Sequence, residues 1–259
     1  MLKSKRLRIF AGPNGSGKST LFPLIQNQFE TGAFINSDNL ESTLNKNGYL
    51  NLEEFGLSVD HKAWEDFCTL SINKTLIEKV AKSGTLVDIT IRDNVLIHEG
   101  GNSNSYVAAL ITSFIRFHLT QNGVSYAYET VMSHPSKIEE IVKANLQGYK
   151  TYLYFVCLED PRLNISRVSN RIEKGGHSVP KEKIIARYQK TLDLLLPALR
   201  AASKAYVFDN SSDKMTLIAK VKKGELTTLL PINQLPNWFI EAVINKAPLP
   251  AEESFPSQN

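Results

Sequence analysis

Cysteine is scarce in this sequence, which has only Cys68 and Cys157 among its 259 residues. Two thiols cannot form a disulfide framework, and the chain has no Cys-x-x-Cys pair or Cys/His cluster of the kind that binds zinc. The N-terminal stretch MLKSKRLRIFAGPNGSGKST is basic and contains no long apolar run. The sequence therefore predicts a cytoplasmic protein with reduced thiols, no signal peptide and no membrane span.

A strong excess of one charge is absent as well. Thirty Lys and Arg residues stand against 26 Asp and Glu residues, which gives a formal net charge of +4. This surplus suits an anionic ligand but is too small to indicate nucleic-acid binding. The shares of hydrophobic residues, 42%, and charged residues, 22%, exclude a wholly disordered or collagen-like chain.

Short apolar runs alternate with segments of helical spacing over most of residues 1–212. The expected strands are 7–11, 33–36, 124–130, 151–158 and 205–208. The expected helices are 19–28, 106–119, 135–146, 161–172 and 180–195. Because strands that alternate with helices pair in parallel, this region predicts an α/β domain with a central parallel sheet flanked by helices.

Three segments depart from this alternation. Residues 41–105 predict a mostly helical insertion with a strand or hairpin over 85–97. Residues 213–247 predict a small C-terminal appendage made of a hairpin and one helix. Residues 248–259 are polar and contain proline, which predicts a disordered tail.

The strongest motif is a glycine-rich loop between the first strand and the first helix, and it matches G-x-x-x-x-G-K-[ST] in full. Glycines let successive backbone N–H groups converge on a phosphate, and the following helix N-terminus adds donors and a favourable dipole. This pattern predicts a P-loop that binds the phosphates of a nucleotide. Its nucleotide-binding residues are Gly12, Pro13, Asn14, Gly15, Ser16, Gly17, Lys18, Ser19 and Thr20.

Three of these residues have specific expected roles. Lys18 is expected to reach the β- and γ-phosphates, and Thr20 to contact the α-phosphate. The Ser19 hydroxyl is the expected protein ligand of Mg²⁺, which prefers oxygen atoms. The motif leaves the reaction open, because kinases, GTPases, motor ATPases and transporters share it.

Two acids follow expected strands, at the edge of the sheet where ligands bind in open α/β folds. Asp38 follows the second strand and is expected to act either as a base for an acceptor hydroxyl or as a water-mediated Mg²⁺ ligand. The alternative is a helix N-cap formed by residues 37–39.

Glu129 ends the 124–130 strand and is expected to orient the acceptor or to hold the waters of the metal. Its alternative is an exposed acid at a strand end. Asp88 also resembles a metal-binding acid but lies in the irregular segment.

Basic residues crowd one helix–loop–helix, with a Gly-Gly pair at 175–176 as a plausible hinge for a lid. These residues are Arg162, Arg167, Arg171, Lys174, His177, Lys181, Lys183 and Arg187. Arg167 and Arg171 are four residues apart and share a helical face. Guanidinium groups match phosphate oxygens, so we expect Arg167 and Arg171 to stabilise the transferred phosphate. The alternative is a solvated helix face.

Five segments in chain order resemble the zeta-toxin-like P-loop kinases. They are AGPNGSGKST, NSD at Asp38, YAYETVMSHPSK at Glu129, RVSNRIEKGGHSVPKEKIIARY and VFDNS. The resemblance extends from Leu7 to Ser212 apart from residues 41–105. The P-loop is widely shared, but the third and fourth segments together are far more specific.

The resemblance implies a kinase that uses ATP and Mg²⁺ to phosphorylate a hydroxyl of a small molecule, with UDP-N-acetylglucosamine as the acceptor used by related toxins. It implies Asp38 as the acceptor base and Glu129 as a residue that binds the sugar. It further implies that Arg167, Arg171 and Arg187 serve the phosphates, and it raises an antitoxin as a partner, which one chain cannot reveal.

Two other functions stay open on sequence grounds. A kinase of nucleic-acid ends or nucleosides would need a basic groove with stacking aromatic residues, and the sequence does not indicate one. A non-catalytic ATP-binding regulatory module would use Asp38 only as a helix cap.

Overall fold

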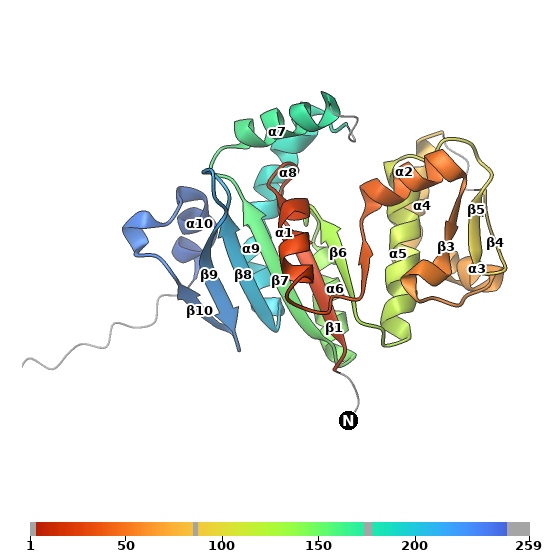
Figure 1. Ribbon diagram of the computed structural model, residues 1–259, viewed down its shortest axis with the longest axis horizontal. Coiled ribbons are helices and arrows are strands. Elements are labelled where there is room, and N and C mark those ends of the chain that lie inside the picture. Colours follow the sequence, from red (N-terminus) through yellow and green to blue (C-terminus); the bar gives the residue numbers. More distant parts are fainter. Residues whose placement is uncertain (1–3, 85–87, 174–177, 248–259) are drawn as a thin grey trace, which may run out of the picture. The chain divides into compact units, whose positions relative to one another are not determined.

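The computed structural model describes residues 4–84, 88–173 and 178–247 (Figure 1). Within these ranges the chain forms two compact units. The first contains the segment that ends at Phe10, the segment from Lys18 to Thr130 and the segment from Ala144 to Tyr152. The second contains Ala11–Gly17, Val131–Lys143 and the chain from Leu153 onward. The tail over 248–259 and the Gly-Gly hinge, both expected from the sequence, lie outside the described residues.

A seven-stranded sheet has the strand order β10-β9-β8-β7-β1-β6-β2. Strand β2 pairs with β6 in parallel, while β8, β9 and β10 pair antiparallel. The expected α/β fold is confirmed as a mixed, mostly parallel sheet flanked by helices. Its strands are β1 (Arg6–Ala11), β2 (Ala33–Ile35), β6 (Tyr126–Thr130), β7 (Lys150–Cys157), β8 (Lys204–Asp209), β9 (Thr216–Lys222) and β10 (Glu225–Thr228).

The insertion belongs to the first unit and contains a second, three-stranded sheet with the order β3-β5-β4. The hairpin expected near 85–97 is formed by β4 and β5, whereas β3 was not expected. The strands are β3 (Tyr49–Asn51), β4 (Ile89–Arg92) and β5 (Val95–His98). The helices of the segment are α2 (Ser37–Asn47), α3 (His61–Thr69) and α4 (Lys74–Lys82), together with the short 3₁₀ turns Leu52–Phe55 and Ser71–Asn73.

Helix α5 (Ser105–Gln121) forms the centre of this region, and α2 and α4 pack against it. Trp64 and Phe67 are buried and contact the fully buried Phe114 edge to face, with ring centroids 5.2 and 5.4 Å apart. Such aromatic pairs stabilise a core by about 0.5–1.5 kcal/mol beyond the area they bury. The aromatic side chains of the insertion therefore pack against α5, the helix that follows the insertion in the chain.

Helices of the second unit gather around α8 (Lys181–Asp193), which packs against α7, α9 and α10. The hairpin and helix expected after Met215 are β9–β10 and α10, although the domain boundary at residue 212 stays a prediction. Trp238 of α10 packs on Phe155 and donates to Asp209 Oδ1 at 2.9 Å. The remaining helices are α1 (Lys18–Gln26), α6 (Ser136–Leu146), α7 (Pro161–Glu173), α9 (Leu195–Ala201) and α10 (Asn237–Ala242).

No helix within the described ranges is long and apolar enough to cross a bilayer. Cys68 and Cys157 are both free thiols.

Burial at the end of β7 gives one pH-dependent prediction. Burial raises the pKa of Cys157 from about 9 to about 12. The unfolded chain therefore loses this proton above about pH 9 while the folded chain keeps it, so the stabilisation is complete below pH 9 and declines as the pH rises toward 12. The slope reaches at most about 1.4 kcal/mol per pH unit for one proton.

When the pH is raised from about 8 to about 9.5, we expect the urea unfolding midpoint to fall less in Cys157→Ala than in the wild type, because the variant lacks the buried thiol. The upper limit is chosen because burial also raises the pKa values of Tyr149 and Tyr188, whose ordinary value is 10.0. Equal losses in the two proteins would contradict the prediction.

Candidate functional site

The glycine-rich loop joins β1 to α1, which is the strand–loop–helix context expected from the sequence (Figure 1). Gly12, Gly15 and Gly17 have φ angles of +140°, +74° and +104°, a region that side chains with a Cβ rarely adopt. A Cβ on Gly12 would also collide with the main-chain oxygen of Val156. The loop conformation therefore requires glycine for backbone and packing reasons together.

The loop leaves one of its hydroxyl groups ready for a ligand. Ser16 is fully buried, and its Oγ has no hydrogen-bond partner within the described part of the chain. A buried polar group without a partner costs about 1–3 kcal/mol. A phosphate oxygen would accept from this hydroxyl, so the loop fits a nucleotide phosphate.

Aromatic packing holds α1 in place behind the loop. Phe22, one turn after Lys18, stacks on Phe34 of β2 with ring centroids 3.7 Å apart and meets Phe10 of β1 edge to face at 5.3 Å. Pro23 is the sixth residue of this nine-residue helix and lies beyond its first turn, so its missing N–H removes a hydrogen bond from the helix interior. This packing fixes the N-terminus of α1 and thus the direction from which Lys18 and Ser19 project.

The first unit brings three of the predicted site residues together. Lys18 Nζ lies 3.7 Å from Glu129 Oε1, and the side chains are only 6% and 15% exposed. Ser19 Oγ donates to Glu129 Oε2 at 2.9 Å. The carboxylate of β6 is therefore an ion-pair and hydrogen-bond partner of the P-loop helix rather than an isolated acid at a strand end.

Asn36 is a member of this cluster that the sequence reasoning missed. Its Nδ2 donates to Glu129 Oε2 at 2.9 Å, and its Oδ1 accepts from the Asn39 N–H at 3.1 Å as the N-cap of α2. Asparagine is a preferred N-cap residue, so the signal was present, but the sequence reasoning looked for the cap over 37–39. The side-chain amide of Asn36 thus caps the N-terminus of α2 and also donates a hydrogen bond to Glu129.

The register of the sheet explains why these residues meet. Ile35 of β2 lies opposite Tyr128 of the parallel strand β6, so the next residues, Asn36 directly after β2 and Glu129 within β6, lie side by side. Asp38 follows in the first turn of α2 and is partly buried. The helix cap is Asn36, not Asp38, which weakens the alternative in which Asp38 serves only as a cap. Thr20 is exposed in the first turn of α1.

The predicted arginines lie in the second unit. Arg167 Nη2 donates to the main-chain oxygen of Asn210 at 3.0 Å. Arg171 lies in the last turn of α7 and Arg187 on α8, and both are partly exposed. Residues 174–177 between these helices lie outside the described ranges, so a hinge there has no structural description.

The donor atoms around Glu129 suit a small hard cation. The Ser19 hydroxyl and the Glu129 carboxylate are both oxygen donors and are one hydrogen bond apart. Mg²⁺ is bound in phosphate-transfer sites through one or two protein oxygens, with phosphates and waters completing the shell. Ser19 and Glu129 therefore fit the metal that the motif implies.

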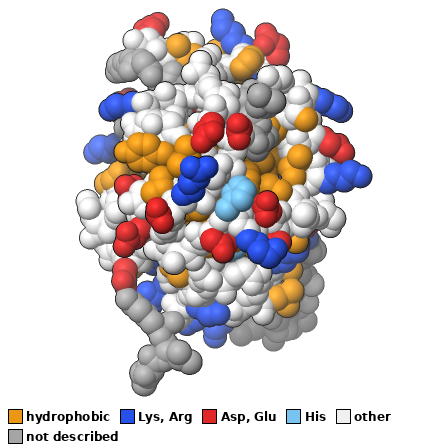
Figure 2. All heavy atoms as spheres, turned by 90° about the vertical axis from the view of Figure 1, so that its right-hand side faces the viewer, with side chains coloured by type: hydrophobic (Ala, Val, Ile, Leu, Met, Phe, Trp, Pro, Cys, Tyr) orange, Lys and Arg blue, Asp and Glu red, His pale blue; other side chains and the backbone are white. Residues whose placement is uncertain are grey.

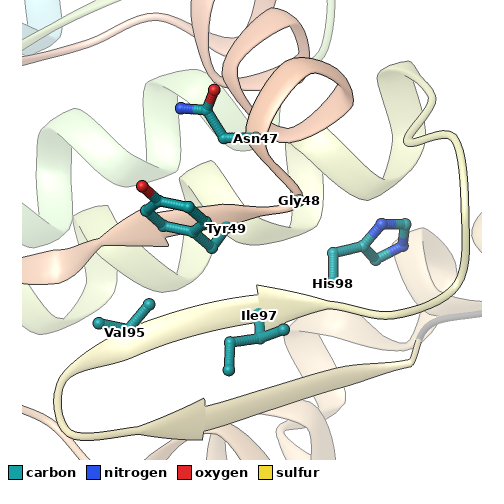
Figure 3. Close-up of a pocket in the computed structure, with 6 residues that line it drawn as sticks. All are labelled: Asn47, Gly48, Tyr49, Val95, Ile97 and His98. Atoms are coloured by element: carbon teal, nitrogen blue, oxygen red, sulfur yellow. The ribbon is translucent and has the colours of Figure 1, made fainter.

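A separate surface hollow of about 410 Å³ lies in the small sheet of the first unit (Figure 3). It is lined by Asn47, Gly48, Tyr49, Val95, Ile97 and His98. Figure 2 shows the insertion from the right-hand side of Figure 1, with hydrophobic side chains and acidic and basic ones among them. None of the six belongs to a motif, and Asp88, the weaker acid candidate, is exposed next to β4 in the same sheet.

Comparison with known proteins gives structures but no sequence relatives. No protein-family model matches the chain, and no curated protein matches it. The complex AvrRxo1-ORF1:AvrRxo1-ORF2 with ATP matches at 13% identity and a TM-score of 0.54, covering 87% of this chain and 61% of that chain. The native form of that complex gives the same values.

A third structure comes from the PezAT chromosomal toxin–antitoxin system of Streptococcus pneumoniae, with 13% identity, a TM-score of 0.44 and coverage of 81% of this chain and 69% of that chain. This chain thus spans about three fifths of the AvrRxo1 structure. At these identities the likeness concerns the fold, and the α/β architecture implied by the zeta-toxin resemblance is confirmed.

Proposed function

We propose that this protein is an ATP-dependent phosphotransferase that moves the γ-phosphoryl group to a hydroxyl of a small molecule. In this reaction the acceptor oxygen forms a bond to the γ-phosphorus while the bond from that phosphorus to the bridging oxygen breaks and ADP leaves. Asp38 takes the proton of the acceptor hydroxyl. Lys18 balances charge on the β- and γ-phosphates, and Arg167, Arg171 and Arg187 stabilise the phosphate in transfer.

The observation that carries the proposal is the cluster of Lys18, Ser19, Asn36 and Glu129 in the first unit. Phosphoryl transfer depends mainly on positioning and charge stabilisation, so a kinase needs cationic and acidic groups fixed at the start of the P-loop helix. The Lys18–Glu129 pair supplies one positive and one negative charge. Asp38 lies in the first turn of α2, and the N-cap of that helix, Asn36, donates a hydrogen bond to Glu129.

Mg²⁺ supplies charge neutralisation at the phosphates when it is bound. Ser19 is the proposed direct ligand. Glu129 accepts from the Ser19 hydroxyl at 2.9 Å, which supports a role in holding the waters of the metal. The resemblance implies instead that Glu129 binds the sugar of the acceptor, and the two roles separate in the Glu129→Gln experiment below.

The acceptor is proposed as a sugar nucleotide such as UDP-N-acetylglucosamine, on the strength of the resemblance. A cytoplasmic location and an antitoxin partner belong to the same proposal. The matching AvrRxo1 structures are two-component complexes, and one of them contains ATP, which supports ATP as the donor here. A kinase of nucleic-acid ends or nucleosides, or a non-catalytic ATP-binding module, is the alternative.

A screen of ATP consumption tests the proposal. Purified protein is incubated with ATP, Mg²⁺ and, in turn, sugar nucleotides, nucleosides and oligonucleotides, with Lys18→Ala as the inactive control. We expect ADP to form with a sugar nucleotide, and Lys18→Ala to reduce that rate by at least about 10³-fold, because a phosphate-binding cation is lost. Consumption only with oligonucleotides would favour the nucleic-acid alternative, and consumption with none would favour the regulatory module.

A further inference from the structure

We propose that Asn164 and Asn210 are positioning residues that clamp the P-loop by holding two of its main-chain carbonyl groups outward, so that its N–H groups face the phosphates. The inference rests on the proposed function only in taking phosphate as the ligand of the loop. All the residues that carry it lie in the second unit.

Asn164 holds the loop from helix α7. Its Nδ2 donates to the main-chain oxygen of Asn14 at 2.6 Å, and the residue is fully buried. Val168, one turn further along α7, is buried on the same face. A Cβ on Gly15 would come within 2.7 Å of the Asn164 main-chain oxygen and 3.3 Å of Val168 Cγ2. The helix therefore touches the loop so closely that only glycine fits.

Asn210 holds the loop from the segment after β8. Its Nδ2 donates to the main-chain oxygen of Ser16 at 2.8 Å, and its own N–H donates to the Cys157 oxygen at the end of β7 at 2.9 Å. A Cβ on Gly17 would collide with the Asn210 amide. The glycines at 15 and 17 thus make room for the two clamping residues, in addition to meeting the φ requirement of the loop.

Arg167 joins the two arms of the clamp. It lies one turn after Asn164 on α7, and its Nη2 donates to the main-chain oxygen of Asn210 at 3.0 Å. The loop carbonyls at 14 and 16, the helix α7 and the segment after β8 are therefore connected by three side-chain hydrogen bonds.

The physical reason that such a clamp matters is preorganisation. A peptide group is planar, so a carbonyl fixed in one direction directs the N–H of the next residue the opposite way. Holding the carbonyls of Asn14 and Ser16 fixes the N–H groups of Gly15 and Gly17. An anion site formed by backbone N–H groups binds more tightly when its donors need no reorganisation.

The test compares neutral variants that remove the side-chain donors: Asn164→Ala and Asn210→Ala, with Asn164→Ser and Asn210→Ser as milder versions. The matched control is Asn73→Ala, because the Asn73 Nδ2 also donates to a main-chain oxygen, that of Phe67, at 2.7 Å, and Asn73 is buried in the first unit. Calorimetry measures the affinities for ATP and for inorganic tripolyphosphate, and thermal melting measures stability. Hydrogen exchange is followed in a peptide that covers residues 12–17.

Each clamp variant is expected to weaken ATP and tripolyphosphate binding about tenfold, which corresponds to about 1.4 kcal/mol, and to speed exchange in the 12–17 peptide. Asn73→Ala is expected to lower the melting temperature without changing either affinity by more than about twofold. Asn210 is partly exposed, so its variants test the clamp even where an Asn164 variant fails to fold.

Unchanged tripolyphosphate affinity in folded clamp variants would overturn the inference, as would an equal loss of affinity in Asn73→Ala. A wild-type protein that binds no tripolyphosphate would overturn both the clamp and the proposed function. A wild-type protein that binds tripolyphosphate and ATP but phosphorylates no acceptor would overturn the proposed function alone, and the clamp would then be judged by the binding data.

Discussion

Replacing Asp38 with asparagine is expected to lower the rate of phosphoryl transfer by about 10²- to 10⁴-fold while leaving ATP affinity within about twofold of the wild type. The reason is that asparagine keeps the shape of the side chain but cannot take the proton of the acceptor hydroxyl. Asp38 lies in the first turn of α2 and is not its N-cap, so the substitution leaves the Asn36 cap intact. The measurements are coupled ADP release for turnover and calorimetry for binding.

Glu41→Gln is the matched control for Asp38→Asn, since it removes a carboxylate three residues later on the same helix. Its turnover should stay close to that of the wild type. The pH–rate profile adds a second criterion, because loss of a general base removes the rise in rate on the acidic side. Unchanged turnover in Asp38→Asn would exclude Asp38 from the mechanism, whatever the protein phosphorylates.

Replacing Glu129 with glutamine is the second change with a large expected effect. The variant loses the ion pair of the nearly buried Lys18 and the charged acceptor for the hydroxyl of Ser19. We expect kcat to fall about 10²-fold or more, and the Mg²⁺ concentration for half-maximal activity to rise, because electrostatic groups at the transferred phosphate typically contribute on this scale. Calorimetry should show a smaller gain in ATP affinity on addition of Mg²⁺.

The same variant distinguishes the two proposed roles of Glu129. A role in acceptor binding would raise KM for the acceptor and leave the Mg²⁺ dependence unchanged, whereas a role with the metal would do the reverse. Asp66→Asn is the control, since Asp66 also pairs with a lysine, Lys62, at 3.1 Å, but on an exposed helix surface. Exposed ion pairs contribute little to stability, so this control should change neither parameter.

Much of the fold was readable because local patterns dictate it. The apolar run before Gly12 and the helical spacing after Lys18 required a strand and a helix around the P-loop, and both are present. Strand β3 was missed because three residues, Tyr49–Asn51, are too short to show an alternating pattern.

The tertiary structure supplied the partners of the site residues. The sequence predicted Glu129 at the ligand-binding edge of the sheet, but its hydrogen bonds to Ser19 and Asn36 depend on β6 lying between β1 and β2. Arg167, predicted to stabilise the transferred phosphate, donates to the main-chain oxygen of Asn210. Asn164 and Asn210 had no predicted role: Asn210 lies in the VFDNS segment, but that segment indicates no hydrogen-bond partner for it.

The sequence alone determined that a phosphate-binding loop stands between a strand and a helix, because glycine spacing and apolar periodicity are local properties of the chain. Only the tertiary structure decided which side chains surround that loop. Register within a sheet and close approach between helix α7 and the loop join residues more than 90 positions apart, such as Asn36 with Glu129 and Asn14 with Asn164, and no local pattern encodes such pairings.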